Sequence, residues 1–157
     1  MIDQIYTYFT IEMIFLWLNI GVIPFWLVLI VFPQSQICRV FITSIFPILL
    51  LSLAYGYLLN LIFNEGYDFT TNFQLYLGLD AVSNLFTNKA FIIIFWTHFL
   101  AMNLFCGGWI VKDSQKFGIN KTLISIPLLT TYFIGPIGLT LYWIIRIFYT
   151  KRISLYD

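Results

Sequence analysis

The chain has 157 residues, of which 61% are hydrophobic and only 10% are charged, and its mean hydropathy is +0.90. A soluble domain carries roughly a quarter charged residues, so these side chains are too few to cover a water-soluble surface. The formal net charge of +1 gives no sign of a nucleic-acid partner. We therefore expect an integral membrane protein surrounded by membrane lipid.

Four continuous apolar runs are each long enough for a helix that crosses the hydrocarbon layer, which takes about 20 residues. They cover residues 11–32, 40–63, 90–111 and 122–149. A transmembrane β-barrel would show short segments of alternating hydrophobicity instead. The sequence thus predicts an all-α fold, with four transmembrane helices bundled in a single membrane domain of residues 1–157.

Between the second and third runs, apolar residues recur at helical spacing on one face of a segment. They are Leu75, Leu79, Val82 and Phe86, while Asp80, Ser83, Asn84 and Asn88 fall largely on the other side. This pattern predicts an amphipathic helix that lies in the headgroup region. A plain loop helix packed on the bundle fits the same pattern.

The positive-inside rule counts Lys and Arg near the ends of spans. Four spans would place Lys89, Arg146, Lys151 and Arg152 on one side of the membrane. The other side would carry Arg39, Lys112, Lys116 and Lys121. Four residues against four set no orientation.

The third run holds the most notable polar residues, because polar side chains inside a span are costly and mark function. His98 lies eight residues in from Ala90, near mid-membrane, and we expect neighbouring helices to enclose its ring. Asn103 lies about 140° around the helix and is typical of an interhelical hydrogen bond. His98 is either functional or bonded to a neighbouring helix. No second ligand lies at metal-binding spacing from it, so neither a metal nor a cofactor is predicted.

The fourth run contains the sequence Gly135-Pro136-Ile137-Gly138. Pro136 lacks a backbone N–H and the glycines admit a close neighbour, so we expect a kink. Carbonyls freed at a kink can face a ligand, although Pro and Gly are also common in spans.

Aromatic residues make up 20% of the chain. Aromatic grooves between helices suit long, flat, apolar ligands such as polyenes or quinones. Packing against lipid accounts for the same composition.

A more specific signal lies in residues 96–114, which read WTHFLAMNLFCGGWIVKDS. This stretch resembles the third helix of the abscisic-acid-deficient-four-like family, small four-helix membrane proteins whose plant members are associated with neoxanthin formation. Residues 77–86 and 127–142, which read LGLDAVSNLF and PLLTTYFIGPIGLTLY, are similar to the middle segment and the fourth helix of that family.

Residue by residue, the resemblance falls on His98, Trp109, Asp113, Gly135, Pro136 and Arg146. It implies catalytic roles for His98 and Asp113, and substrate contacts from Trp96, Asn103, Trp109, Gly135 and Pro136. Asn103 stands where the family has an aspartate, and Gly108 where an arginine is common. Neoxanthin formation moves protons, which asparagine cannot do because it does not titrate, whereas a neutral imidazole can. From its place at the exit of the third run, Asp113 also fits a solvated interface charge.

Two functional hypotheses follow. The first is a membrane protein that binds or isomerises a carotenoid-like or xanthophyll-like polyene within the bilayer, which leaves open whether it is an enzyme. The second is a structural accessory subunit that packs into a larger respiratory or photosynthetic complex with other membrane subunits. A bacterial inner membrane, a mitochondrial membrane and a plastid membrane all fit the composition.

Overall fold

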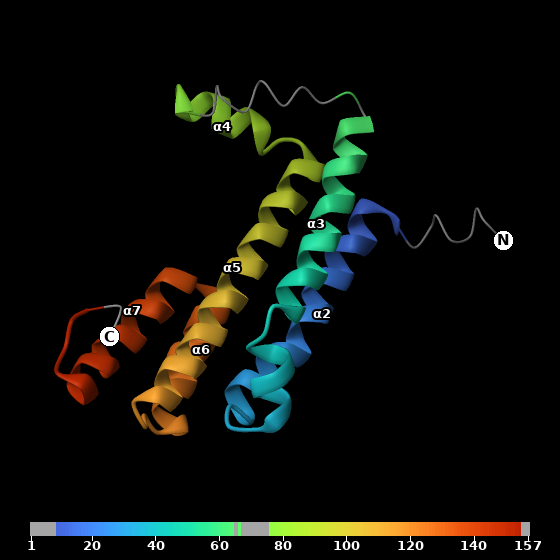
Figure 1. Ribbon diagram of the computed structural model, residues 1–157. Helices are drawn as coiled ribbons and strands as arrows, with labels where there is room; N and C mark the ends of the chain where they lie inside the picture. The colour runs from blue at the N-terminus through green and yellow to red at the C-terminus, as the bar shows by residue number, and fades with distance from the viewer. Residues whose placement is uncertain (1–8, 65, 67–75, 155–157) are drawn as a thin grey trace. The chain divides into compact units, whose positions relative to one another are not determined.

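The computed structural model describes residues 9–64, 66 and 76–154. These residues form six α-helices and one five-residue π-helix, and no strand occurs among them (Figure 1). The chain forms two compact units. One takes Met1–Ile20 and Leu50–Phe99, and the other takes Gly21–Leu49 and Leu100–Asp157.

Three helices are long and apolar enough to cross a membrane: α2 (Ile11–Val31), α3 (Phe46–Asn64) and α5 (Lys89–Lys116). They correspond to the first three predicted runs. Helix α3 begins later than predicted, because Cys38–Ile42 forms the π-helix η2 and the chain bends before Phe46. Helix α5 continues beyond the apolar run as far as Lys116.

The predicted amphipathic segment is a helix over only part of its length. Helix α4 spans Leu79–Leu85, and Leu75 lies outside the described residues. None of the α4 residues is buried. Phe86, directly after the helix, packs edge-on against Phe91 and Phe95. A helix is therefore confirmed at Leu79–Leu85, and its place at the membrane surface stays a prediction.

The fourth run differs most from the prediction, because it forms two helices in place of one kinked helix. Helix α6 spans Lys121–Phe133, helix α7 spans Gly135–Thr150, and Ile134 between them is extended, with φ −140° and ψ 81°. Pro136 lacks the N–H that would continue the ladder of hydrogen bonds. Both helices are too short to count among the membrane-crossing helices of the described chain. The sequence thus predicted the position of the break, but it predicted a kink where the chain forms two separate helices.

Glycine allows α7 to fold back closely onto α6. A Cβ atom at Gly138 would collide with the backbone and the hydroxyl of Thr131. A Cβ atom at Gly135 would collide with the side chain of Asn103 on α5. Only glycine leaves this space to a neighbouring backbone or amide.

The contacts along α5 give the direction of the two helices. The start of α7 lies at Asn103, whereas Tyr142 and Arg146, further along α7, contact Asp113. Asn103 and Asp113 are ten residues apart on α5, about 15 Å, so α7 runs the same way as α5. Helix α6 follows α5 after a short turn and runs the opposite way. Together α6 and α7 make a helical hairpin whose two ends both lie near the end of α5 (Figure 1).

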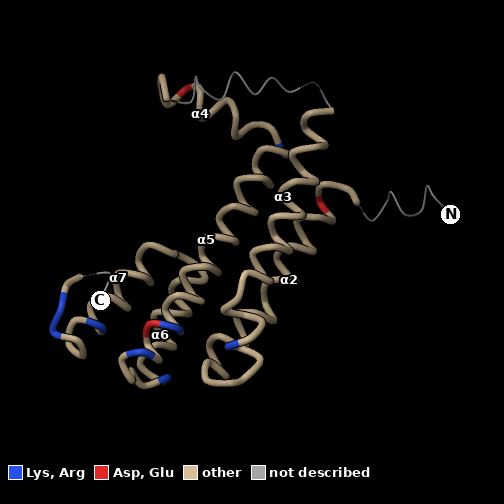
Figure 2. The backbone as a smooth tube through the Cα atoms, viewed as in Figure 1, with Lys and Arg blue, Asp and Glu red and all other residues tan. Residues whose placement is uncertain are grey.

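Because α6 and α7 form a hairpin, the basic residues lie elsewhere than four spans would place them. Lys and Arg gather where α5 ends, where α6 begins and where α7 ends (Figure 2). Arg39 joins them, because it lines a groove together with residues from the last turn of α5. Of the eight basic residues in the chain, only Lys89 lies at the other end of α5. The even division of these residues, which was expected from four spans, assumed that residues 122–149 form one span, and the described chain breaks that run at Ile134.

Candidate functional site

The two polar residues that the sequence places within α5 have different surroundings. His98 is exposed, so the expected enclosure of its ring does not occur. Near it on α5, Trp96 donates a hydrogen bond from Nε1 to Oδ1 of Asn19 (3.1 Å) and stacks on Phe99. The described part of the chain contains no group of three His, Cys, Asp or Glu residues that could hold a metal ion.

Asn103 is buried and lies at the tip of the α6–α7 hairpin. Its Nδ2 donates a hydrogen bond to the carbonyl oxygen of Tyr132 (3.4 Å), and its Oδ1 lies against Gly135. An unbroken helix would satisfy the Tyr132 carbonyl with the N–H of residue 136, which in proline is missing. Asn103 thus supplies the hydrogen bond that Pro136 takes away. Three of the predicted substrate-binding residues, Asn103, Gly135 and Pro136, therefore lie together here and stabilise the break between α6 and α7.

Asp113 is the centre of a buried polar cluster further along α5. Its Oδ2 accepts a hydrogen bond from the hydroxyl of Tyr142 (2.6 Å) and pairs with Nε of Arg146 (2.8 Å). The Arg146 side chain is completely buried and that of Asp113 is 10% exposed. The expectation of a solvated interface charge at Asp113 is therefore wrong, because α7 covers it.

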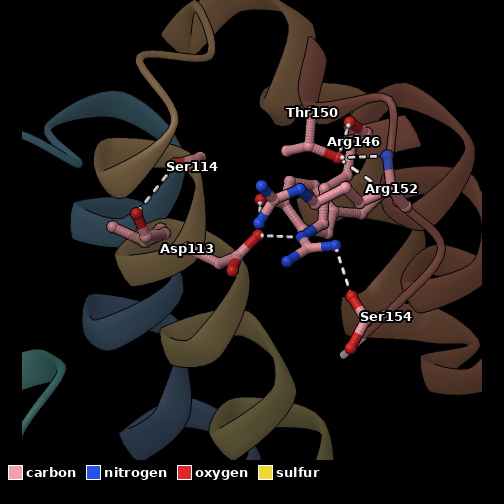
Figure 3. Close-up of polar contacts among 8 residues, drawn as sticks. Asp113, Ser114, Arg146, Thr150, Arg152 and Ser154 are labelled. Carbon is pink, nitrogen blue, oxygen red and sulfur yellow. Dashed lines mark hydrogen bonds and ion pairs between the residues drawn. The ribbon is translucent and has the colours of Figure 1, made fainter. Parts of the chain in front are cut away.

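Aromatic rings and the C-terminal segment complete the surroundings of Arg146. Its guanidinium lies over the rings of Phe117 (4.7 Å) and Trp143 (5.3 Å). Its Nη1 donates a hydrogen bond to the carbonyl oxygen of Ser154 (2.8 Å) (Figure 3). The cation thus contacts a carboxylate, a carbonyl oxygen and two aromatic faces. Such compensation is what a charge removed from water needs.

Trp109 joins this cluster to the apolar part of the unit. Its ring stacks on Trp143 with the ring centroids 6.0 Å apart and meets the edge of Tyr142 at 5.7 Å. Ring packing and the ion pair therefore both hold the later part of α7 in place. Of the predicted site residues, Trp109 and Asp113 belong to this one cluster.

A groove of about 240 Å³ lies beside Trp109, and we call it the Trp109 groove. Its apolar lining includes Ile42, Ile45, Ile48, Leu104 and Phe105. Polar atoms come from Thr43, Ser44 and Lys112. Gly108 is also part of the wall, and a Cβ atom there would come no nearer than 3.9 Å to Thr43. The groove is apolar with a few polar groups, which is the usual make-up of a site for a small apolar ligand.

The sequence analysis gave no catalytic or substrate-binding role to Tyr142 or Arg146, although the family resemblance falls on Arg146. Both contact Asp113, and they are four residues apart on α7, so they share one face of the helix. The arginine in this apolar run is the signal that could have indicated a partner carboxylate, because a buried cation needs a counter-charge. Asp113 is the carboxylate at the matching end of α5.

The comparison with known families agrees with the resemblance in the sequence. The family model described as ABA DEFICIENT 4-like matches residues 13–142. The chain belongs to this family. No curated protein and no solved structure was found to be similar to the chain. In this ABA DEFICIENT 4-like protein, the match includes Trp109, Asp113 and Tyr142.

Proposed function

We propose that this protein binds the end ring of a xanthophyll-like polyene in the Trp109 groove and isomerises it within the bilayer. The observation that carries the proposal is the groove itself, an apolar slot on α5 with hydroxyl and ammonium groups at its edge. Family membership and the apolar helices support a ligand that is itself dissolved in the membrane.

The size of the groove favours one end of a ligand over a whole polyene. Its volume of about 240 Å³ is below the range of roughly 300–1,000 Å³ that holds a complete drug-sized ligand. An end ring would lie between Trp109 and Ile45, and the polyene would continue along the lipid-facing surface. The hydroxyls of Thr43 and Ser44 and the ammonium of Lys112 are suited to hydroxyl or epoxide oxygens on such a ring.

We assign different roles to the two residues proposed for catalysis. Asp113 acts as a positioning residue, because its Oδ2 holds Tyr142 and Arg146 and so fixes the rings around Trp109. His98 remains the proposed proton carrier. It precedes Trp109 by eleven residues on α5, about 16 Å, so it meets the part of the polyene outside the groove and not the ring within it. Its exposed side chain is free to meet a membrane-dissolved substrate.

The test uses the purified protein in a neutral detergent with an added epoxy-xanthophyll. Co-elution of pigment with protein measures binding, and chromatography of the extracted pigment measures isomerisation. We expect Trp109→Ala to lose pigment retention, and Gly108→Leu to lose it by filling the groove. We expect Trp17→Ala, at an exposed tryptophan of α2, to retain pigment. His98→Gln should keep binding and lose isomerisation.

Equal retention by Trp109→Ala and the wild-type protein would refute the assignment to the Trp109 groove. Trp17 lines another apolar groove, with Phe9, Ile14 and Tyr57. Loss of pigment from Trp17→Ala alone would therefore move the site there. No retention and no isomerisation by the wild-type protein would refute the proposed function as a whole.

A further inference from the structure

A second groove lies at the end of the second unit where the basic residues gather. We call it the basic groove, and its volume is about 760 Å³. Its walls come from the chain after α2, from η2, from the last turn of α5 and from the start of α6. The polar residues that line it are Gln34, Arg39, Ser114, Gln115, Asn120 and Lys121.

The charge of the basic groove has one sign. Arg39 and Lys121 come from different walls, and none of the lining residues is acidic. In the described chain, Lys89 pairs with Glu12 and Arg146 pairs with Asp113. Among the described residues, neither Arg39 nor Lys121 pairs with a carboxylate. The groove thus keeps two cations next to the amide groups of three side chains.

Hydrogen bonds fix the walls of the basic groove. Gln115 donates from Nε2 to the carbonyl oxygen of Pro33 (2.7 Å), which ties the end of α5 to the chain after α2. Gly118, at φ +64°, lies just after the end of α5, and Ile119 donates its N–H to the carbonyl oxygen of Ser114 (2.9 Å). Asn120 caps α6 by accepting the N–H of Thr122 (3.0 Å). The groove is therefore already formed before a ligand binds.

The depth of the basic groove matches the headgroups of lipids. Lys112 marks the end of the apolar part of α5, and Ser114 and Gln115 follow it in the last turns. At 1.5 Å per residue they lie about 3–5 Å further out. Phosphate groups of phospholipids occupy this level, just outside the hydrocarbon layer.

We propose that the basic groove binds a phosphate group, carried by an anionic phospholipid headgroup or by a soluble phosphate ester. Arg39 provides a planar fork of donors that matches phosphate oxygens, and Lys121 provides a mobile ammonium. The amides of Gln34 and Gln115 are further donors along the wall. The proposal does not depend on the bound polyene, because the two grooves share no lining residue.

The experiment compares ligand retention by native mass spectrometry of the purified protein. Three probes are used: phosphatidylglycerol, phosphatidylcholine and glycerol 3-phosphate. Arg39→Gln and Lys121→Gln each remove one charge-assisted contact, so we expect each to weaken phosphatidylglycerol binding about tenfold or more. Lys151→Gln removes the same charge from an exposed residue outside the groove. We expect it to bind as the wild-type protein does.

A further variant keeps the fold and lowers the positive charge of the groove. Asn120→Asp retains a good capping residue for α6 but places a carboxylate in the groove, so it should also lose phosphatidylglycerol. Retention of phosphatidylglycerol alone would identify a lipid headgroup, and retention of glycerol 3-phosphate as well would identify a site for phosphate esters. Either result supports the proposal. Equal retention of phosphatidylglycerol and phosphatidylcholine, or equal binding by Asn120→Asp and Lys151→Gln, would overturn it.

Discussion

Removing one member of the Asp113–Arg146 pair should destabilise the protein strongly. Asp113→Asn leaves the completely buried guanidinium of Arg146 without its counter-charge, and Arg146→Met leaves the carboxylate with only Tyr142 as a partner. Breaking a buried pair in this way costs about 3–5 kcal/mol. Because each single change removes the same interaction, the double variant should lose far less than the sum, with a coupling energy of about 2–3 kcal/mol.

The measurement is equilibrium unfolding in mixed micelles, followed by circular dichroism. The stacked rings of Trp109 and Trp143 provide a near-ultraviolet signal for the same cluster. The matched control is Glu12→Gln, which breaks an ion pair whose two side chains are 78% and 68% exposed. Such a pair contributes little because water screens it, so no change is expected. Additive losses in the double variant, or single variants as stable as Glu12→Gln, would refute the role of the pair in holding α7.

Three other predictions follow from the packing, the burial and the hairpin. Gly107→Ala should destabilise the protein, because its Cβ would come within 2.8 Å of a buried tryptophan ring on α2, whereas Gly108→Ala should stabilise it by about 0.5–1 kcal/mol through helix propensity. The same unfolding assay tests this pair, and a reversed order would contradict the packing. Burial raises the pKa of the Cys38 thiol to about 11. In a variant that lacks Cys106, alkylation of Cys38 should therefore be negligible at pH 7, and its rate should rise about tenfold per pH unit up to that pKa. Fast alkylation at pH 7 would show that the thiol is not buried. In a cysteine-free background expressed in bacteria, Lys151→Cys should be labelled from the cytoplasmic side, where basic ends of spans stay, and Asn88→Cys from the opposite side. Labelling of both from one side would contradict the hairpin.

The long helices could be predicted from the sequence, because apolar runs of sufficient length have no other stable form in a membrane. The break at Ile134 could not be predicted in full. Pro136 removes one hydrogen bond in any helix, and a kinked helix often tolerates this loss. Whether the chain turns back depends on what receives the freed carbonyl, and here Asn103 does so from α5. That contact joins residues 29 positions apart, beyond the range of a local pattern.

The site was predictable in its residues but not in its grouping. The family resemblance pointed to Trp109, Asp113 and Arg146, and the structure brings these residues together. The interpretation of Asp113 as a surface charge failed because it assumed that α5 ends in water. The position of His98 on an exposed face was also not predictable, since helical periodicity gives the face of a residue and not the partner that the face meets.

The helical hairpin also constrains the order in which this protein is made. During biosynthesis α5 leaves the ribosome before α6 and α7 do. Until they arrive, Asn103 and the carboxylate of Asp113 lack the partners that they have in the folded chain. Neither α6 nor α7 is long enough to halt the insertion machinery as an independent span. The last quarter of the chain must therefore dock onto a helix already in the membrane, and a chain that stops short of residue 121 would present an uncompensated acid to cellular quality control.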